Sequence, residues 1–207
     1  LGAARRASEG ERLVRAGEWD WWSPAFMVGT QVTGKTLGVV GMGRVGRIVA
    51  KRAKYGFDMN IRYSNRSQLS PELEDGAIFH ETVEDMLPHC DFLSLNCPAT
   101  PDTIDLMNAE RLALLPDGAI LVNTSRGAVV DEDALIDALN SGKLAAAGLD
   151  VYKGEPGVNP KIAELTNTFL MPHIGSSTFE TRDAMGFLAL DNLDAFFRGK
   201  EPPTRVA

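Results

Sequence analysis

Cysteine and histidine are scarce in this chain, which has two cysteines and three histidines among 207 residues. Cys90 and Cys97 flank residues 91–96, a run that reads as a single strand and would hold the two thiols far apart. A disulfide is therefore not expected, and a reducing cytoplasm is the expected location. A chain of this length buries enough apolar surface to fold without disulfides or metal ions, and we predict no metal site.

Long apolar runs and an excess of positive charge are missing as well. No run approaches the roughly 20 residues that a membrane-spanning helix needs, so we expect no membrane partner. A formal net charge of −7 argues against nucleic acid as a partner, because such proteins need a basic face to displace counterions. A single phosphorylated cofactor stays compatible with this charge, since a few local cations and a helix N-terminus suffice to bind it.

The chain does contain a regular alternation of strand and helix patterns. Strands are predicted at Thr36–Val40, Met59–Tyr63, Asp91–Asn96, Ala119–Asn123, Leu144–Val151 and Thr168–Met171. Helices are predicted up to Ala16 and at Arg44–Tyr55, Val83–Leu87, Ala109–Leu115, Asp131–Asn140 and Thr178–Phe197, with Gly17, Gly56 and Gly142 as helix stops. The helix from Arg44 is expected to bury Val45, Ile48, Val49 and Ala53. The alternation predicts an α/β fold, a doubly wound parallel sheet with helices on both faces.

A glycine motif joins the first predicted strand to the helix that follows it: Gly41-Met42-Gly43-Arg44-Val45-Gly46. Gly41 permits a tight turn, Gly43 lets the backbone approach a pyrophosphate, and Gly46 lets helix and strand pack closely. Arg44 and Val45 open the helix, whose N-terminus supplies unpaired N–H groups and a partial positive charge. A glycine-rich turn is the alternative, but the position between strand and helix favours a Rossmann-type dinucleotide-binding domain.

The end of the second predicted strand bears on which cofactor binds. NAD enzymes usually carry a carboxylate there, about 20 residues after the glycine motif, to bind the ribose hydroxyls. This chain instead has Ser64, Asn65 and Arg66, which offer donors and a cation. Because Arg66 would pair with a 2′-phosphate that a carboxylate would repel, NADP(H) is favoured over NAD(H). The alternative is a solvated Arg66 and a site that accepts either cofactor.

Three polar residues follow three later strands. They are Arg126, Glu155 and His173, after the strands that end near residues 123, 151 and 171. In an open parallel sheet, ligands bind beyond the carboxyl ends of the strands. All three residues are therefore expected beside the cofactor, where a substrate would lie.

Further motifs stand in the order and spacing of one known family. They are Asn96–Pro101, Asn123–Gly127, Leu149–Val151 with Glu155-Pro156, and Pro172–Gly175. With the glycine motif, they make the chain resemble the D-isomer-specific 2-hydroxyacid dehydrogenase family over nearly its whole length. Ser64-Asn65-Arg66 and residues 21–24 are most similar to its glyoxylate/hydroxypyruvate reductase branch.

The resemblance implies a role for each of the three polar residues. His173 would donate a proton to the developing alkoxide, which suits imidazole because it exchanges protons near neutral pH. Glu155 would pair with His173 and keep it protonated. Arg126 would bind the carboxylate of the substrate and polarise its carbonyl group. The implied reaction is hydride transfer from NADPH to a small 2-keto acid, glyoxylate or hydroxypyruvate above others.

The resemblance also implies the remaining cofactor contacts. Asp150 would hold the nicotinamide carboxamide. Cys97, Thr103 and Thr124 would line the nicotinamide side, largely through backbone atoms. Pro98, Ser125, Gly175 and Ser176 complete the expected set.

Family members close a second, smaller domain over the cofactor, and the resemblance implies that most of that domain is missing from this chain. The absence of an initiator Met also suggests a chain that begins partway through a longer protein. We expect an interdomain helix at 1–17, an NAD(P)-binding domain at 18–177, and a helix and tail at 178–207 that return to the missing domain. Such a chain is expected to bind NADPH but to turn over poorly or not at all.

Several alternatives stay open at this point. Other family activities, such as that of phosphoglycerate dehydrogenase, fit the same motifs, and so does a non-catalytic cofactor sensor of the corepressor kind. Trp19, Trp21 and Trp22 form either a packed edge of the domain or, as the reductase branch implies for Trp22, part of a homodimer contact. His80 and His89 are interpreted as structural or solvated.

Overall fold

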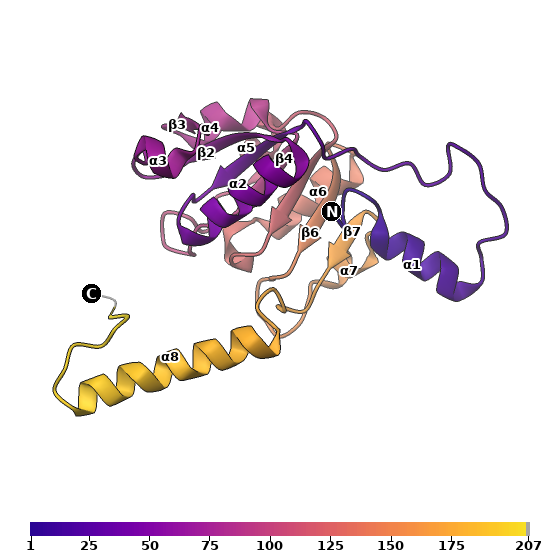
Figure 1. Cartoon of the computed structure of the whole chain (residues 1–207). Helices are drawn as coiled ribbons and strands as arrows, with labels where there is room; N and C mark the ends of the chain where they lie inside the picture. The colour runs from indigo at the N-terminus through magenta and orange to yellow at the C-terminus, as the bar shows by residue number, and fades with distance from the viewer. Residues whose placement is uncertain (206–207) are drawn as a thin grey trace. The chain divides into compact units, whose positions relative to one another are not determined.

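A parallel sheet of seven strands organises the computed structural model, which describes residues 1–205 (Figure 1). The strands are β1 (Thr36–Val40), β2 (Asn60–Ser64), β3 (Ile78–His80), β4 (Phe92–Leu95), β5 (Ala119–Asn123), β6 (Leu144–Leu149) and β7 (Thr168–Leu170). Their order across the sheet is β3-β2-β1-β4-β5-β6-β7, and every neighbouring pair is parallel. The predicted doubly wound parallel sheet is confirmed.

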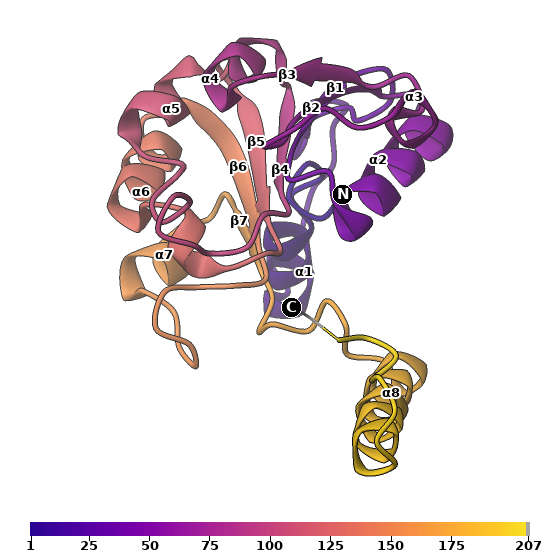
Figure 2. The same ribbon diagram turned by 90° about the vertical axis from the view of Figure 1, so that its left-hand side faces the viewer.

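Helices cover both faces of this sheet. The described residues form the helices α1 (Ala7–Ala16), α2 (Arg44–Phe57), α3 (Pro71–Glu74), α4 (Val83–Met86), α5 (Ala109–Leu114), α6 (Glu132–Asn140), α7 (Pro160–Glu164) and, in a separate unit, α8 (Phe179–Phe197), with 3-10 turns at Leu87–His89 and Gly127–Val129. Figure 2 shows α2 and α3 on one face, and α4, α5, α6 and α7 on the other. None of the helices within the described residues is both long and apolar enough to cross a bilayer.

Alternation along the strands divides the core between the two faces. Val39 packs in the cluster on the α2 side, and Val40, the next residue, packs in the cluster on the α5 and α6 side. Ile120 and Leu121 in β5 divide in the same way. Both faces of each central strand are therefore buried, which explains why the strands read as continuous apolar runs.

The helix after the glycine motif differs from the prediction in two respects. Its buried residues are Gly46, Ala50 and Ala53, whereas Val45 and Ile48 are 61% and 50% exposed. The expected apolar face was therefore wrong at Val45 and Ile48, because a helix packed this closely on β1 accepts only small side chains there. It was right at Ala53, which is buried, and in part at Val49, which packs against the core on this side. Gly56 does not end the helix, which continues to Phe57 and ends where Asp58 takes a left-handed conformation with φ of 50°.

Other predicted elements have different bounds or were missed. The short strand β3 and the short helices α3 and α7 were not predicted, and His80 is the last residue of β3. Both cysteines are free thiols, as expected, and both are buried. Trp19, Trp21 and Trp22 are more than half exposed, so the interpretation as a packed edge is wrong for this chain.

The chain divides into two compact units, Leu1–Pro172 and the residues from His173 onward. The first unit contains the whole sheet. The second contains α8, in which no residue is buried and whose Phe179 and Phe197 are 89% and 80% exposed.

Candidate active site

The carboxyl ends of six neighbouring strands lie in register. Ser64, Val40, Leu95, Asn123, Leu149 and Leu170, the last residues of β2, β1, β4, β5, β6 and β7, are paired one to the next. The loops after these strands therefore leave from a single edge of the sheet. The chain reverses its direction of travel between β1 and β4, and a reversal of this kind is where open α/β sheets bind ligands.

The glycine motif lies at this point of reversal, and its backbone is packed closely against neighbouring backbone atoms. Gly41 has a φ of 88°, and a Cβ added there would lie 2.7 Å from the backbone nitrogen of Cys97. A Cβ at Gly46 would lie 2.3 Å from the carbonyl oxygen of Gly41. Gly43 is different, since no atom lies within 4 Å of its added Cβ. Gly41 and Gly46 are thus required by packing, and Gly43 leaves open space before the first turn of α2.

The N-terminus of α2 has the features of an anion site. Gly43 is the N-cap residue and provides no side chain to cap the helix, and no acidic residue stands in the first turn. Arg44 and Val45, the first helical residues, are exposed. The N–H groups of this turn lack intrahelical partners and carry the positive end of the helix dipole.

The loop after β2 is attached to the glycine motif by two hydrogen bonds. The backbone N–H of Gly41 donates to the carbonyl oxygen of Ser64 at 3.1 Å, and the N–H of Met42 donates to Oδ1 of Asn65 at 2.7 Å. The side-chain oxygen of Asn65 thus supports the glycine motif, and its amide nitrogen is the donor that remains for a ribose or phosphate. Arg66 follows and is exposed.

Asn123 organises the turn that carries Arg126. Its Oδ1 accepts hydrogen bonds from the backbone N–H and the hydroxyl of Ser125, at 3.0 and 2.9 Å, and its Nδ2 donates to the carbonyl oxygen of Arg126 at 2.9 Å. Asn123 is 1% exposed, whereas Thr124 and Arg126 are exposed. The guanidinium of Arg126 donates to the carbonyl oxygen of Ser125 at 2.6 Å.

Tyr152 organises the neighbouring loop, which carries Glu155. The hydroxyl of Tyr152 donates to the carbonyl oxygens of Met171 and Leu149, at 2.9 and 3.2 Å, and burial raises its pKa so that it stays protonated. The backbone N–H of Tyr152 donates to Oε1 of Glu155 at 2.8 Å. Tyr152 therefore ties the ends of β6 and β7 together and fixes the start of the Glu155 turn.

The Arg126 and Glu155 loops touch through a glycine. A Cβ added at Gly127 would lie 2.0 Å from the carbonyl carbon of Tyr152 and 2.4 Å from the backbone nitrogen of Lys153. Both atoms are backbone and have no rotamer by which to move away. The structure thus brings the two loops together at the edge of the sheet.

We expect Gly127→Ala to lower the free energy of unfolding by about 3 kcal/mol, because the two loops must separate to admit a methyl group. Urea denaturation measures the effect. Gly186→Ala is the control, because no atom lies within 4 Å of the Cβ added at this helical glycine. A Gly127→Ala variant with the urea midpoint of the wild type would contradict the close approach of the two loops.

The other expected cofactor contacts in the first unit lie in the loops after β4 and β6. Cys97 is buried, and burial raises the pKa of its thiol, so the residue offers backbone atoms rather than a thiolate. The hydroxyl of Thr103 donates to the carbonyl oxygen of Pro98 at 2.6 Å, which closes the loop on itself. Asp150 is 7% exposed, and its backbone N–H donates to the carbonyl oxygen of Asn123 at 3.0 Å.

His173, Gly175 and Ser176 belong to the second unit. His173 is exposed and has a φ of 55°, a left-handed conformation that is uncommon outside glycine. The contact of His173 with Arg126 and Glu155 stays a prediction.

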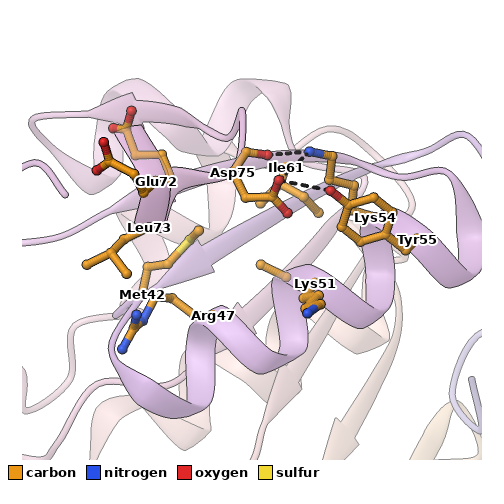
Figure 3. A pocket seen from close by; sticks show the side chains of 11 residues that line it. Met42, Arg47, Lys51, Lys54, Tyr55, Ile61, Glu72, Leu73 and Asp75 are labelled. Carbon is orange, nitrogen blue, oxygen red and sulfur yellow. Dashed lines mark hydrogen bonds and ion pairs between the residues drawn. The ribbon is translucent and has the colours of Figure 1, made fainter. Parts of the chain in front are cut away.

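A cavity of about 530 Å³ lies between α2 and α3, and Met42 of the glycine motif is among its lining residues (Figure 3). Its walls carry three cations from α2 and three carboxylates from the segment at α3: Arg47, Lys51 and Lys54 against Glu72, Glu74 and Asp75. Opposite charges balance across it, and the loops after β4, β5 and β6 contribute no lining residue. We therefore assign the cavity no part in the site.

Sequence reasoning missed Asn123 and Tyr152 as organisers of the site. For Asn123 a signal was present, since an asparagine side chain commonly closes a turn by accepting a hydrogen bond from the backbone N–H two residues later. Tyr152 carried no such signal, because its partners Leu149 and Met171 become neighbours only when β6 pairs with β7.

These features define a dinucleotide-binding domain of the Rossmann type. The model of a family described as "D-isomer specific 2-hydroxyacid dehydrogenase, NAD binding domain" matches residues 1–175. The chain belongs to this family, as the sequence motifs predicted.

Curated relatives of known name resemble the chain over nearly all of its length. A glycerate dehydrogenase of Hyphomicrobium methylovorum is 45% identical over 203 residues, which are 97% of this chain and 63% of the relative. A glyoxylate reductase of Pyrococcus furiosus is 45% identical over 210 residues, which are 100% of this chain and 62% of the relative. The chain therefore spans somewhat less than two thirds of the length of these relatives.

A solved structure adds a bound cofactor to the comparison. An NADPH-dependent glyoxylate/hydroxypyruvate reductase of Sinorhizobium meliloti, in complex with NADP and malonate, has a TM-score of 0.92 and 35% identity to the chain. The match covers 100% of this chain and 64% of that protein.

Proposed function

We propose that this chain is the cofactor-binding part of an oxidoreductase that transfers a hydride from NADPH to a small 2-keto acid, glyoxylate or hydroxypyruvate above others. The observation that carries the proposal is the common edge at which the glycine motif, the Arg126 turn and the Glu155 turn meet. The names of the relatives support the same class of substrate.

The residues at this edge fit a nicotinamide dinucleotide. The uncapped first turn of α2 and the open space at Gly43 suit a pyrophosphate. Oδ1 of Asn96, at the end of β4, is buried and finds no hydrogen-bond partner among the described residues. A buried acceptor of this kind costs free energy, and a donor on a bound cofactor would remove that cost.

The preference for NADPH over NADH rests on the loop after β2. Ser64, Asn65 and Arg66 provide donors and a cation, and no carboxylate stands among them to repel a 2′-phosphate. The Sinorhizobium meliloti reductase, described as NADPH-dependent, supports the same choice. NAD(H) is the alternative cofactor.

The chemistry assigned to the chain follows from its residue types. When bound, NADPH would supply the hydride that adds to the carbonyl carbon of the keto acid. Arg126 would bind the carboxylate of the substrate through its planar fork. His173 would give its ring proton to the carbonyl oxygen, and Glu155 would favour the protonated ring before transfer. Asp150 would orient the carboxamide of the nicotinamide.

A steady-state assay tests the function. NADPH oxidation is followed at increasing glyoxylate or hydroxypyruvate, with the chain alone and with a longer form that supplies the remaining third of the relatives' length. We expect the chain to bind NADPH, and the longer form to oxidise it only when keto acid is present. Cofactor binding without any keto-acid-dependent oxidation in the longer form would favour a non-catalytic sensor instead.

We expect Arg66→Asp to weaken NADPH binding about 20-fold while NADH binding changes less than about threefold. The substitution replaces the partner of a 2′-phosphate by a group that repels it, and one charge-assisted pair accounts for an effect of this size. Fluorescence titration with both cofactors measures it. The control is Arg52→Asp, which makes the same charge change at an exposed position of α2. Equal losses for both cofactors would remove the assignment of Arg66.

Two further proposals concern the whole protein. Exposed tryptophans at positions 19, 21 and 22 and the exposed apolar residues of α8 support association into a homodimer. The division into an interdomain helix at 1–17, a cofactor domain at 18–177 and a returning segment at 178–207 also remains a proposal, as does a cytoplasmic location.

A further inference from the structure

A tyrosine hydroxyl closes the loop that follows β2. The hydroxyl of Tyr63 accepts a hydrogen bond from the backbone N–H of Leu69 at 3.0 Å and donates to Oε1 of Glu74 at 2.5 Å. The same oxygen of Glu74 accepts a hydrogen bond from the side chain of Gln68 at 2.9 Å. The loop 64–69 therefore starts directly after Tyr63, and its last residue is bonded back to the hydroxyl of the same tyrosine.

Tyr63 is a firm point of attachment for this loop. It is 0% exposed, and its ring packs against Phe79 with centroids 5.3 Å apart. Burial raises the pKa of its hydroxyl to about 12, so the group is protonated at neutral pH and donates. The hydrogen bond from Tyr63 lowers the pKa of Glu74, so the acceptor is a carboxylate under the same conditions.

The loop has a second attachment on the opposite side. Oδ1 of Asn65 accepts the hydrogen bond from the N–H of Met42, within the glycine motif. Arg66 lies between the two attachments and is exposed. The backbone around Arg66 is thus held on both sides by hydrogen bonds within the protein.

We propose that Tyr63 is a positioning residue for cofactor selection, whose hydroxyl fixes the loop so that Arg66 meets the 2′-phosphate of NADPH. This inference rests on the proposed function, and on the role of Arg66 within it. A preformed loop binds without first losing conformational freedom, so loosening it weakens the phosphate contact. The adenosine and pyrophosphate contacts made elsewhere are left as they were. Selectivity for the phosphate, rather than affinity in general, is therefore what Tyr63 controls.

Calorimetric titration of the full chain with 2′,5′-ADP and with 5′-AMP tests the inference, because the two nucleotides differ only in the 2′-phosphate. We expect Tyr63→Phe to weaken 2′,5′-ADP binding about tenfold and 5′-AMP binding less than about twofold, the size of one charge-assisted hydrogen bond. The control is Tyr55→Phe, which removes a hydroxyl that donates to Oδ1 of Asp75 at 2.9 Å (Figure 3). Tyr55 lies outside the loop, so neither affinity should change.

The outcomes separate the inference from the function on which it rests. A wild-type chain that binds neither nucleotide nor NADPH contradicts the proposed function. A wild type that prefers 2′,5′-ADP, with a Tyr63→Phe variant that keeps this preference or loses both nucleotides equally, overturns only the positioning role. If Tyr63→Phe does not fold, Glu74→Ala removes the other end of the network without altering the core, and the same loss of preference is expected.

Discussion

Gly46→Ala is expected to weaken the binding of NADPH and NADH alike by at least about 100-fold. The added Cβ would lie 2.3 Å from the carbonyl oxygen of Gly41 and 3.2 Å from Cγ1 of Val39. Relief requires the start of α2 to move away from β1, and this movement withdraws the N–H groups that would face the pyrophosphate. Losing one or two charge-assisted hydrogen bonds gives a change of this size. Equilibrium titration with both cofactors measures it.

The same helix contains a control for this substitution. No atom lies within 4 Å of a Cβ added at Gly56, near the end of α2. Gly56→Ala should leave both affinities unchanged and stabilise the helix by about 1 kcal/mol, since alanine is the better helix former. Should Gly46→Ala bind either cofactor as tightly as Gly56→Ala does, the glycine motif is not the pyrophosphate site.

The small residues of α2 show why its buried face could not be predicted from the hydrophobic pattern alone. Apolarity at helical spacing predicted Val45 and Ile48 as buried, but the distance between helix and strand decides which residues fit. The carbonyl oxygen of Gly41 leaves no room for a Cβ at Gly46, and Ala50 and Ala53 continue this narrow face. A hydrophobic pattern gives the direction of a helix face only when the spacing to its neighbour admits large side chains.

The strand β3 could not be predicted from the sequence for a different reason. Three residues, Ile78–His80, are too few to establish a period of two. Their extended conformation depends on pairing with Arg62, Tyr63 and Ser64 of β2, a contact that is not encoded locally. The longer strands, by contrast, are apolar on both faces, which made them visible in the sequence.

The placement of the site was predictable because topology fixes it. Once strands and helices alternate, every loop after a strand must leave from one edge, so Arg126 and Glu155 were expected beside the glycine motif. The supporting hydrogen bonds were not predictable, because they join distant segments. The hydrogen bond from Met42 to Asn65 spans 23 positions, and the one from Tyr152 to Met171 spans 19. Sequence therefore located the chemical groups, and the structure identified what orients them.

That orientation makes Arg126 a clean target for a test of the chemistry. The turn around it is held by Asn123, through the backbone atoms of Ser125 and Arg126 and the hydroxyl of Ser125. The guanidinium bonds only to the carbonyl oxygen of Ser125 among the contacts described. Removing the Arg126 side chain should therefore leave the turn, the fold and the cofactor site in place.

In a longer form that turns over, Arg126→Ala is expected to lower kcat/KM for the keto acid about 1000-fold, because the carboxylate and the developing oxyanion lose their donor. NADPH affinity should stay within about twofold of the wild type. Stopped-flow measurement of NADPH oxidation and cofactor titration provide the two values. Arg52→Ala, at an exposed position of α2, controls for the loss of one positive charge.

Asn123→Ala has the opposite effect to Arg126→Ala, because it disrupts the turn and leaves the guanidinium in the protein. It keeps the guanidinium but removes the three hydrogen bonds that shape the turn, so both thermal stability and turnover should fall. If Arg126→Ala also loses stability, the residue acts through the turn and not on the substrate. If it keeps both stability and full turnover, the carboxylate of the keto acid is bound elsewhere, and the edge defined by β4, β5 and β6 serves the cofactor alone.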